Sequence, residues 1–298
     1  MGVDGGGSAL RVVLVDEEMN VLAQSERGTA NPSSIGREAA AVLIQVAIHE
    51  TLETAGKTAD DVRAIALGIA GTAHAQEWVR EVGQSALPNA LIVPSSDFEI
   101  ALVGARGERF GVIIVAGTGS VAWGINRAGE SVQVGGWGYL LGDEGSGYWI
   151  GMEALKTFVR TMDMQRAEEQ QVLLVQRIAE ALNLSNPREI IQWTYSQSRV
   201  RDIAQLSKTV LELAGSGDVG ARAIVDAAIS HLAQLISMIH QRLNDHQLPA
   251  AFAGGLLDNE NYLSVRLAQH LHLPAVPQPR YPPVMGAALL AKFVWKGT

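Results

Sequence analysis

The chain has no cysteine among its 298 residues, and this absence removes several kinds of site at once. Disulfides, thiolate zinc sites, iron–sulfur clusters and cysteine nucleophiles all need a thiol. Charged residues make up only 18% of the chain and aromatic residues 5%, whereas the hydrophobic share is 47%. A chain of this composition can bury a full apolar core and is not typical of disorder.

Long hydrophobic runs and basic clusters are also missing. No uninterrupted apolar stretch reaches the length of a membrane span, and no basic segment followed by an apolar one stands at the N-terminus. The net charge is −8, and no dense run of Lys and Arg is present to bind a nucleic-acid backbone. We therefore predict a soluble, cytosolic protein that acts on small molecules, with no nucleic-acid or membrane partner.

Strand and helix patterns alternate along the chain, which predicts an α/β fold with a helix-rich second half. The predicted strands are Leu10–Val15, Asn20–Ala23, Ala64–Ile69, Leu91–Val93, a strand and hairpin within Val112–Ile125, and Ala250–Ala253. The predicted helices are Arg37–Ala55, Gln76–Gly83, Asp97–Arg106, Gly147–Met162, Ala167–Leu182, Arg201–Ala214, Val219–Asn244, Asn259–Leu271 and Val284–Trp295. We predict domains at 1–110 and 111–298 with a cleft between them, and a last helix (about 284–298) that packs at the hinge or on the first domain.

Twice in the chain, a short apolar strand runs into a glycine loop that ends in a hydroxyl residue. The first loop is Gly5-Gly6-Gly7-Ser8, and the second is Gly117-Thr118-Gly119-Ser120. Strand, glycine turn and strand predict a β-hairpin, and glycine lets the backbone approach a ligand closely. Successive backbone N–H groups in such a turn bind anions, and the hydroxyl adds a donor. Two such loops indicate two related halves that bind one polyphosphate, which points to ATP.

Two further features fit a nucleotide site. Asp4 directly precedes the first loop, where a carboxylate can hold Mg²⁺ directly or through water; the alternative is a turn aspartate that binds its own backbone. Gly254 and Gly255 follow the strand Ala250–Ala253 and precede a helix expected near Asp258. Two glycines there fit either close approach to the adenosine or a tight strand–helix turn.

The seven histidines form no set with the spacing of metal ligands.

The order of these motifs resembles that of the actin, sugar-kinase and Hsp70 superfamily. Within it, the chain is similar to the N-acetylglucosamine kinase branch of the BadF/BadG/BcrA/BcrD-type ATPase family. The matching segments are Val3–Ser8, Val115–Ser120, Phe252–Leu257, Pro283–Ala288 and, most specifically, the run GGWGYLLGDEGSGYWIG at Gly135–Gly151. The resemblance covers essentially the whole chain and implies a two-domain actin-like (ribonuclease H-like) ATPase fold with a central cleft.

The resemblance also implies a catalytic residue. Asp97, after Ser96, matches the aspartate that takes the proton of the sugar hydroxyl, although the family often has Asn in place of Ser96. A carboxylate suits this step because the proton leaves late in a loose transition state. From the residues alone, Asp97 is equally an N-cap of a helix over Phe98–Arg106.

Sugar contacts are implied at residues spread over the chain. Asn31 and Asp143 match an amide and a carboxylate that bind sugar hydroxyls, although alone they predict a loop turn and a helix cap. Thr118 is expected to face the sugar, and Gly136 and Trp137 to line its pocket. Trp137 is equally a core residue by composition alone.

One departure from the family pattern concerns the first glycine loop. The family often has Thr-Lys-Thr after the glycines, whereas this chain has Ser8-Ala9-Leu10. The serine keeps the hydroxyl but the lysine charge is absent. We therefore expect ATP to bind with reduced affinity.

Together, these features predict an ATP-dependent kinase that transfers the γ-phosphoryl group of MgATP to O6 of N-acetylglucosamine. Glucosamine kinase and a broad hexokinase are alternatives, because glucosamine, glucose, N-acetylmannosamine and N-acetylmuramic acid need similar hydroxyl contacts. A dehydratase activator of the same family needs a cysteine-ligated iron–sulfur centre, which the lack of cysteine disfavours. A non-catalytic sugar or ATP sensor is the alternative of another class. The resemblance further implies a homodimer.

Overall fold

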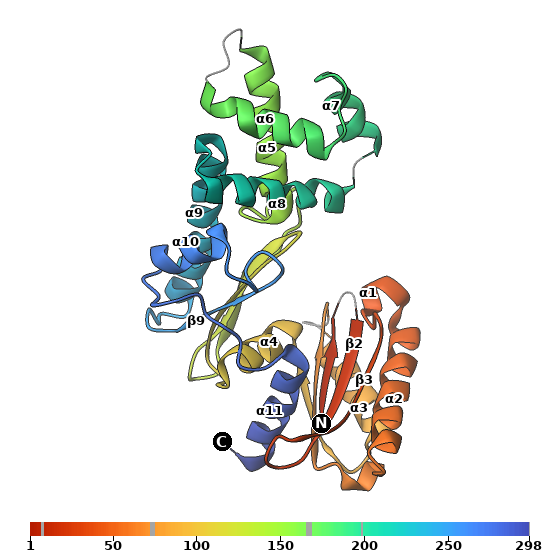
Figure 1. The fold of residues 1–298 in the computed structure, drawn as a ribbon. Helices are drawn as coiled ribbons and strands as arrows, with labels where there is room; N and C mark the ends of the chain where they lie inside the picture. The colour runs from red at the N-terminus through yellow and green to blue at the C-terminus, as the bar shows by residue number, and fades with distance from the viewer. Residues whose placement is uncertain (7–8, 72–74, 165–168, 198, 298) are drawn as a thin grey trace. The chain divides into compact units, whose positions relative to one another are not determined.

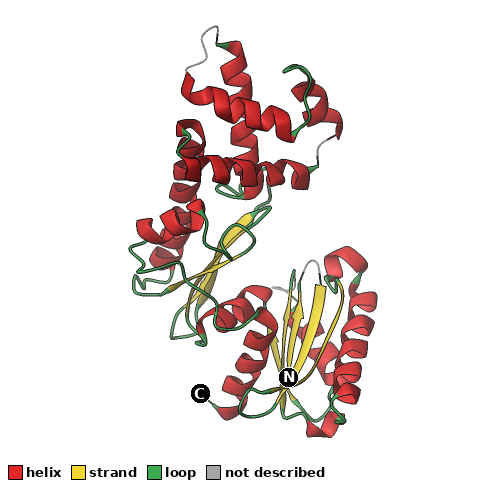
Figure 2. Ribbon diagram, viewed as in Figure 1, coloured by secondary structure: helices red, strands yellow, loops and turns green. Residues whose placement is uncertain are grey.

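The computed structural model describes residues 1–6, 9–71, 75–164, 169–197 and 199–297. The chain forms two compact units, Met1–Gly111 with Pro279–Thr298 (unit 1) and Val112–Gln278 (unit 2). Each unit has its own β-sheet with helices packed on it (Figures 1 and 2). The predicted α/β class with a helix-rich second part is confirmed.

Unit 1 is built on a five-stranded sheet of order β3-β2-β1-β4-β5. Its strands are β1 (Gly2–Gly5), β2 (Ala9–Val15), β3 (Val21–Gly28), β4 (Ala64–Ile69) and β5 (Leu91–Ser95). Its helices are α1 (Pro32–Ile35), α2 (Arg37–Thr54), the 3₁₀ turn η1 (Ala59–Asp61), α3 (Gln76–Ala86), α4 (Asp97–Arg106) and α11 (Pro283–Lys296). β1, β2 and β3 form an antiparallel meander, and β4 and β5 run parallel to β1.

Both faces of this sheet are covered, because apolar residues point to each side of the inner strands. In β2, Leu10, Val12 and Leu14 join the core under α2, whereas Val13 packs against α11. Every residue of β4 is buried, as expected for a central strand with helices on both faces. Figure 1 shows α2 and α3 on one face and α4 and α11 on the other.

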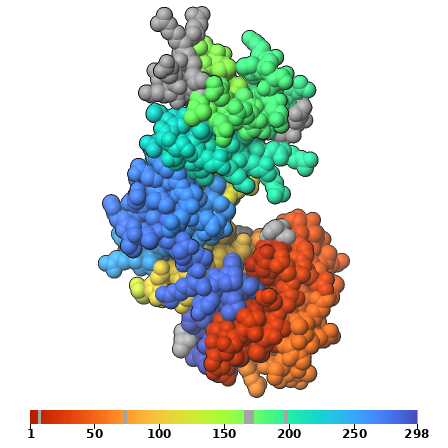
Figure 3. All heavy atoms as spheres, in the orientation of Figure 1, coloured from red at the N-terminus to blue at the C-terminus, as the bar shows by residue number. Residues whose placement is uncertain are grey.

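Glycines let α4 and α11 approach the sheet and each other closely. A Cβ on Gly2 would lie 2.3 Å from the carbonyl oxygen of Val284, and one on Gly68 would lie 2.4 Å from Cδ1 of Ile100. A Cβ on Gly286 would lie only 2.0 Å from the carbonyl oxygen of Ile100. Thus α11 packs onto β1 despite the distance in sequence, and Figure 3 shows the last residues (dark blue) against the first (red).

Unit 2 is built on a four-stranded sheet of order β8-β7-β6-β9. Its strands are β6 (Gly111–Ala116), β7 (Ser120–Ile125), β8 (Ser131–Gly135) and β9 (Ala250–Ala253). Its helices are α5 (Gly147–Asp163), α6 (Glu169–Ala181), α7 (Glu189–Gln192), the π-helical turn η2 (Trp193–Gln197), α8 (Val200–Ser216), α9 (Val219–Arg242) and α10 (Tyr262–His270). This strand order is the same as that of β3-β2-β1-β4 in unit 1, with β6 in the place of β1. The two glycine loops therefore occupy equivalent positions, each after the first strand of its unit.

Within the described ranges, α9 is the one helix with the length and apolar composition of a membrane span. It is not an uninterrupted apolar stretch, because it contains Arg222 and Asp226. One face of it, including Ile224, Leu232 and Ile239, is buried in unit 2. The core helix of a soluble protein has the same properties.

Several predicted elements differ from the observed ones. Helix α10 begins at Tyr262 rather than near Asn259, because the side chain of Asn261 accepts hydrogen bonds from the backbone N–H groups of Leu263 (2.9 Å) and Ser264 (3.1 Å) and caps the helix. The strand predicted at Asn20–Ala23 is longer, and β8, α1, α7 and η2 were not predicted. The start of the helix predicted at Ala167–Leu182 lies outside the described residues.

Candidate functional site

Two carboxylates, of which Asp4 is buried and Asp97 half-buried, lie at the carboxyl ends of the parallel strands of unit 1. Asp4 is in β1, and Asp97 begins α4 just after β5. Ligands of open α/β sheets bind at this edge. The two groups interact, because the charge of Asp97 contributes to the raised pKa of Asp4. The structure therefore brings the predicted base and the predicted metal ligand together.

Burial is the main cause of the raised pKa at both aspartates. It raises the pKa of Asp4 to about 6, against the opposing effect of the Arg11 guanidinium. It also raises the pKa of Asp97, against the backbone N–H groups of Phe98 and of Asp97 itself. A carboxylate with a raised pKa accepts a proton more readily and is typical of functional sites.

Three structural alternatives for the aspartates are wrong. Asp4 lies within a strand rather than in a turn. The cap of α4 is Ser96, whose Oγ accepts from the N–H of Glu99 at 3.1 Å, so Asp97 does not cap the helix. The cap of α5 is likewise Ser146 and not Asp143. None of the three aspartates therefore has the local role, turn or helix cap, that its sequence position alone predicts.

Asn31 caps the short helix α1, which begins at Pro32, and so it is not in a plain loop turn. Its Oδ1 accepts from the N–H of Ser33 at 2.9 Å, while its Nδ2 donates to none of the described residues. Thr29 connects this cap to the first glycine loop, because its Oγ1 donates to the carbonyl of Gly6 (3.3 Å) and accepts from the N–H of Asn31 (3.1 Å). Sequence reasoning missed Thr29, for which no motif gives a signal.

The first glycine loop is described in part. Gly5 ends β1, and its carbonyl accepts from the N–H of Ala70 at 2.9 Å. Gly6 lies close to Asp4, since a Cβ on Gly6 would be 3.6 Å from Oδ1 of Asp4. The predicted phosphate contacts Gly7 and Ser8 lie outside the described residues.

In unit 2, the second glycine loop is held by its carbonyl groups. The first N–H groups of α5, from Gly147 and Tyr148, donate to the carbonyls of Gly117 (2.7 Å) and Thr118 (3.2 Å). The backbone N–H groups of Thr118 and Gly119 donate to no group in the described part of the chain. The hydroxyl of Ser120 is buried and donates to the carbonyl of Glu144 at 2.9 Å. The loop thus presents backbone donors, while the hydroxyl of Ser120 is already bonded within the protein.

Asp143 packs directly against this loop. A Cβ on Gly119 would lie 2.5 Å from Oδ2 of Asp143, so glycine is needed there. Burial raises the pKa of Asp143, and the N–H groups of Ser120 and Gly138 oppose this by donating to it. Asp143 itself has a left-handed backbone, with φ of 59°. The structure therefore brings together the predicted phosphate loop and one predicted sugar residue.

The glycine pair after β9 lies beside the same loop. Gly254 has φ of 90°, and a Cβ there would lie 2.5 Å from the carbonyl oxygen of Ala116, so the tight turn accounts for this glycine. A Cβ on Gly255 would meet nothing within 4 Å. A Cβ on Gly117 would be 3.9 Å from the N of Gly255. The open space at Gly255 leaves room for a ligand to approach the backbone.

Trp137 is 75% exposed, so its interpretation as a core residue is wrong. It lies between Gly136 and Gly138, which both have positive φ, in the loop after β8. The next residues, Leu140 and Leu141, are also highly exposed. An exposed apolar loop next to Asp143 is consistent with a binding role.

A hollow of about 290 Å³ in unit 1 is separate from these residues. It is lined by residues such as Leu14, Met19, Lys57 and Trp295, and none of the predicted site residues lies in its wall. The candidate site is therefore defined by side-chain chemistry at the strand ends and not by this hollow.

Comparison with known proteins decides the family. The model of the BadF/BadG/BcrA/BcrD ATPase family matches residues 1–291. The chain belongs to this family. It is 31% identical to the N-acetylmuramic acid/N-acetylglucosamine kinase of Clostridium acetobutylicum, over 92% of this chain and 90% of the relative. It is also 31% identical to the N-acetyl-D-glucosamine kinase of Dictyostelium discoideum, over 98% of this chain and 97% of the relative.

Among solved structures, this BadF-family chain is similar to a proposed N-acetylglucosamine kinase of Chromobacterium violaceum. The TM-score is 0.68 and the identity 27%, over 98% of this chain and 97% of the other. The fold is therefore that of the actin-like sugar kinases. The recognition of the family from the glycine loops and the Gly135–Gly151 run is confirmed.

The raised pKa of Asp4 gives a stability prediction. We expect Asp4→Asn to unfold at a higher temperature than the parent protein at pH 7.5, without nucleotide or Mg²⁺. The folded form holds the Asp4 proton more tightly than the unfolded form, so ionisation costs stability as the pH rises from 3.8 to about 6, and the cost is fully present above 6. This difference in pKa corresponds to roughly 3 kcal/mol, which asparagine removes.

Differential scanning calorimetry at pH 7.5 and pH 4 checks this, because the gain should shrink at the lower pH. Asp16→Asn is the matched control: hydrogen bonds from Asn20 lower the pKa of Asp16, so its loss should not stabilise unit 1. An equal gain for Asp4→Asn at both pH values would contradict the prediction.

Proposed function

We propose that the chain is an ATP-dependent amino-sugar kinase that transfers the γ-phosphoryl group of MgATP to O6 of N-acetylglucosamine. The observation that carries the proposal is the interacting carboxylate pair, buried Asp4 and half-buried Asp97, at the strand ends of unit 1 in a member of this ATPase family. The names of the two 31%-identical relatives, both N-acetylglucosamine kinases, support the acceptor.

Asp97 is the proposed base. Phosphoryl transfer depends mainly on positioning and charge, and the acceptor hydroxyl loses its proton late. Asp97 is free of a capping role, and burial raises its pKa, so it can accept this proton.

Asp4 is the proposed ligand of Mg²⁺, directly or through water. It is a buried carboxylate that accepts no hydrogen bond from the described residues, and such an oxygen fits a hard cation. Bound Mg²⁺ would neutralise charge on the transferred phosphate groups.

We assign the phosphates to the two glycine loops, Gly5–Ser8 and Gly117–Ser120. The backbone N–H groups of Thr118 and Gly119, which have no acceptor among the residues that the structure describes, support this for the second loop. Ser120 would stabilise the conformation of the second loop rather than contact the phosphates, because its hydroxyl donates to the carbonyl of Glu144. Gly254 would shape the adenosine contact and Gly255 would make it.

We assign the sugar to Asn31, Thr118, Gly136, Trp137 and Asp143. The Nδ2 of Asn31, which donates to none of the described residues, can donate to a hydroxyl, and the carboxylate of Asp143 can accept from one. Trp137 offers an exposed aromatic face to an apolar part of the sugar. The cytosolic location, which composition predicts, and the homodimer, which the family resemblance implies, remain predictions.

ADP release from MgATP tests the function. We expect release to depend on N-acetylglucosamine, measured beside glucosamine, glucose, N-acetylmannosamine, N-acetylmuramic acid and a sugar-free control. N-acetylmuramic acid is included because the name of the Clostridium relative contains it. Preference for another sugar would keep the kinase and correct the acceptor. Sugar binding by calorimetry without any sugar-dependent release would favour a non-catalytic sensor.

A further inference from the structure

A row of charged residues crosses the sheet of unit 1 at the edge that carries Asp4. Arg11 of β2 is the direct partner of Asp4 in β1, and Glu26 of β3 is the direct partner of Arg11. Residues opposite each other on neighbouring strands point to the same face. Glu26, Arg11 and Asp4, which we call the cross-strand row, therefore share the face on which α4 carries Asp97.

The guanidinium of Arg11 is held from one side. Its Nε and Nη2 donate to the two carboxylate oxygens of Glu26, at 3.2 Å and 3.3 Å. Its Nη1 lies 3.8 Å from Oδ2 of Asp4, which is too long for a hydrogen bond. Arginine has five N–H donors. Two of those of Arg11 donate to Glu26, and the others, apart from the long ion pair with Asp4, make no hydrogen bond in the described part of the chain. The side chain is 45% exposed, so these donors are within reach of a ligand.

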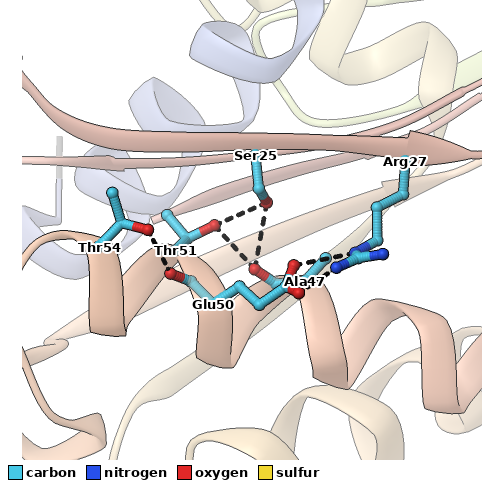
Figure 4. A network of polar contacts seen from close by, with 6 residues as sticks. All are labelled: Ser25, Arg27, Ala47, Glu50, Thr51 and Thr54. Carbon is cyan, nitrogen blue, oxygen red and sulfur yellow. Dashed lines mark hydrogen bonds and ion pairs between the residues drawn. The ribbon is translucent and has the colours of Figure 1, made fainter.

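No other cation in the first 36 residues can serve the first glycine loop. Arg11 and Arg27 are the only Lys or Arg residues there, and Ala9 stands where the family often has lysine. Arg27 points to the opposite face, where its Nε donates to Glu50 of α2 at 2.9 Å (Figure 4). Arg11 is therefore the one basic side chain of this segment on the face of Asp4.

We propose that Arg11 donates from Nη1 to the terminal phosphate groups of the bound nucleotide and so replaces the lysine that this chain lacks. The proposal rests on the proposed kinase function. Glu26 fixes the guanidinium in place, which lowers the entropy lost when a phosphate binds. The carboxylates of Glu26, Asp4 and Asp97 outnumber this single positive charge, so a cation beside Asp4 is still attracted.

Equilibrium binding tests this without any turnover. In calorimetry with Mg²⁺, Arg11→Met should weaken binding of the ATP analogue AMPPNP by roughly 10- to 100-fold, the usual loss for a hydrogen bond to a charged group. Binding of AMP, which lacks the terminal phosphates, should be unchanged. Arg11→Lys should recover most of the loss, because lysine also binds phosphate as a point charge.

Arg27→Met is the matched control, since it removes an arginine–glutamate pair from the neighbouring strand on the other face. It should leave AMPPNP binding unchanged, and thermal unfolding should show whether the two variants lose similar stability. Unchanged AMPPNP binding in Arg11→Met, or an equal loss for AMP and AMPPNP, would overturn the proposal.

The two proposals fail in different ways. If the parent protein shows no sugar-dependent ADP release but Arg11→Met still weakens AMPPNP selectively, the kinase function falls and the phosphate contact stands. If sugar-dependent release is present and Arg11→Met binds AMPPNP normally, the kinase stands and the role of Arg11 falls.

Discussion

Asp97→Asn should turn over about 10²–10⁴-fold more slowly than the parent protein, the usual contribution of a general base. Asparagine keeps the shape of the side chain but cannot accept the proton of the sugar hydroxyl. Binding of AMPPNP should be unchanged, because Asp97 is assigned to the acceptor and not to the nucleotide. Steady-state ADP release with saturating N-acetylglucosamine, together with calorimetry, measures both quantities.

The pKa of Asp97 adds a second readout to this experiment. Burial raises the pKa in the folded protein, so the ionised carboxylate destabilises the fold above the ordinary pKa of aspartate. Asp97→Asn should therefore unfold at a higher temperature than the parent protein at neutral pH, and this gain should fade as the pH falls towards that ordinary value. A variant that is slow and also more stable is not slow because it is unfolded.

Ser96→Ala is the control for damage to the start of α4. It removes the cap that accepts from Glu99, at a cost of about 1 kcal/mol in stability, but keeps the carboxylate of Asp97. We expect its turnover to stay near that of the parent protein. Near-normal turnover in Asp97→Asn, or an equal loss in Ser96→Ala, would remove Asp97 from the role of base.

Gly286→Ala should destabilise unit 1 by roughly 3 kcal/mol or more, at the upper end of what added atoms cost in a packed core. The new Cβ would lie 2.0 Å from the carbonyl oxygen of Ile100 and 2.4 Å from the N of Gly104. These are backbone atoms of α4, which cannot rotate away. Helix α11 would have to move off α4 and off β1, where Gly2 gives it room.

Chemical denaturation followed by circular dichroism measures this loss. Gly215→Ala is the matched control: Gly215 is also in a helix, α8, but a Cβ there meets nothing within 4 Å. That change should be neutral or stabilise by up to about 1 kcal/mol, because alanine favours helix. Equal stability of the two variants would show that α4 and α11 do not pack as described.

The sequence predicts the inner elements of this fold well, for clear physical reasons. The strands Ala64–Ile69 and Ala250–Ala253 and the helix Asp97–Arg106 have the predicted bounds, because apolar runs end there at glycine or at a capping serine. The edge strand β8 was missed although Ser131-Val132-Gln133-Val134 alternates polar and apolar residues, because the strand is only five residues long and none of its residues is buried.

The candidate site was predictable as motifs but not as geometry. The positions of Asp4, Asp97 and the two glycine loops follow from residues that stand at strand ends. The contacts of Arg11 and Thr29 could not be predicted from the sequence. Those of Arg11 depend on the register between neighbouring strands, and those of Thr29 on the rotamer of its side chain. Trp137 shows the converse: a glycine-flanked aromatic residue can pack well in a core, yet this one is 75% exposed.

The packing of α11 on unit 1 also sets the order in which the protein can be completed during synthesis. Unit 2 is continuous in sequence, whereas unit 1 needs residues from both ends of it. At ~5–20 residues per second, a ribosome makes α11 roughly ten to forty seconds after it has finished α4. Throughout that time, the face of β1 and β4 that α11 covers has no partner helix, although Asp4 and Asp97 have already been made. The part of the chain that is translated first is therefore the last to be finished, and a chain that ends before Pro283 would leave unit 1 without the helix that covers this face of its sheet.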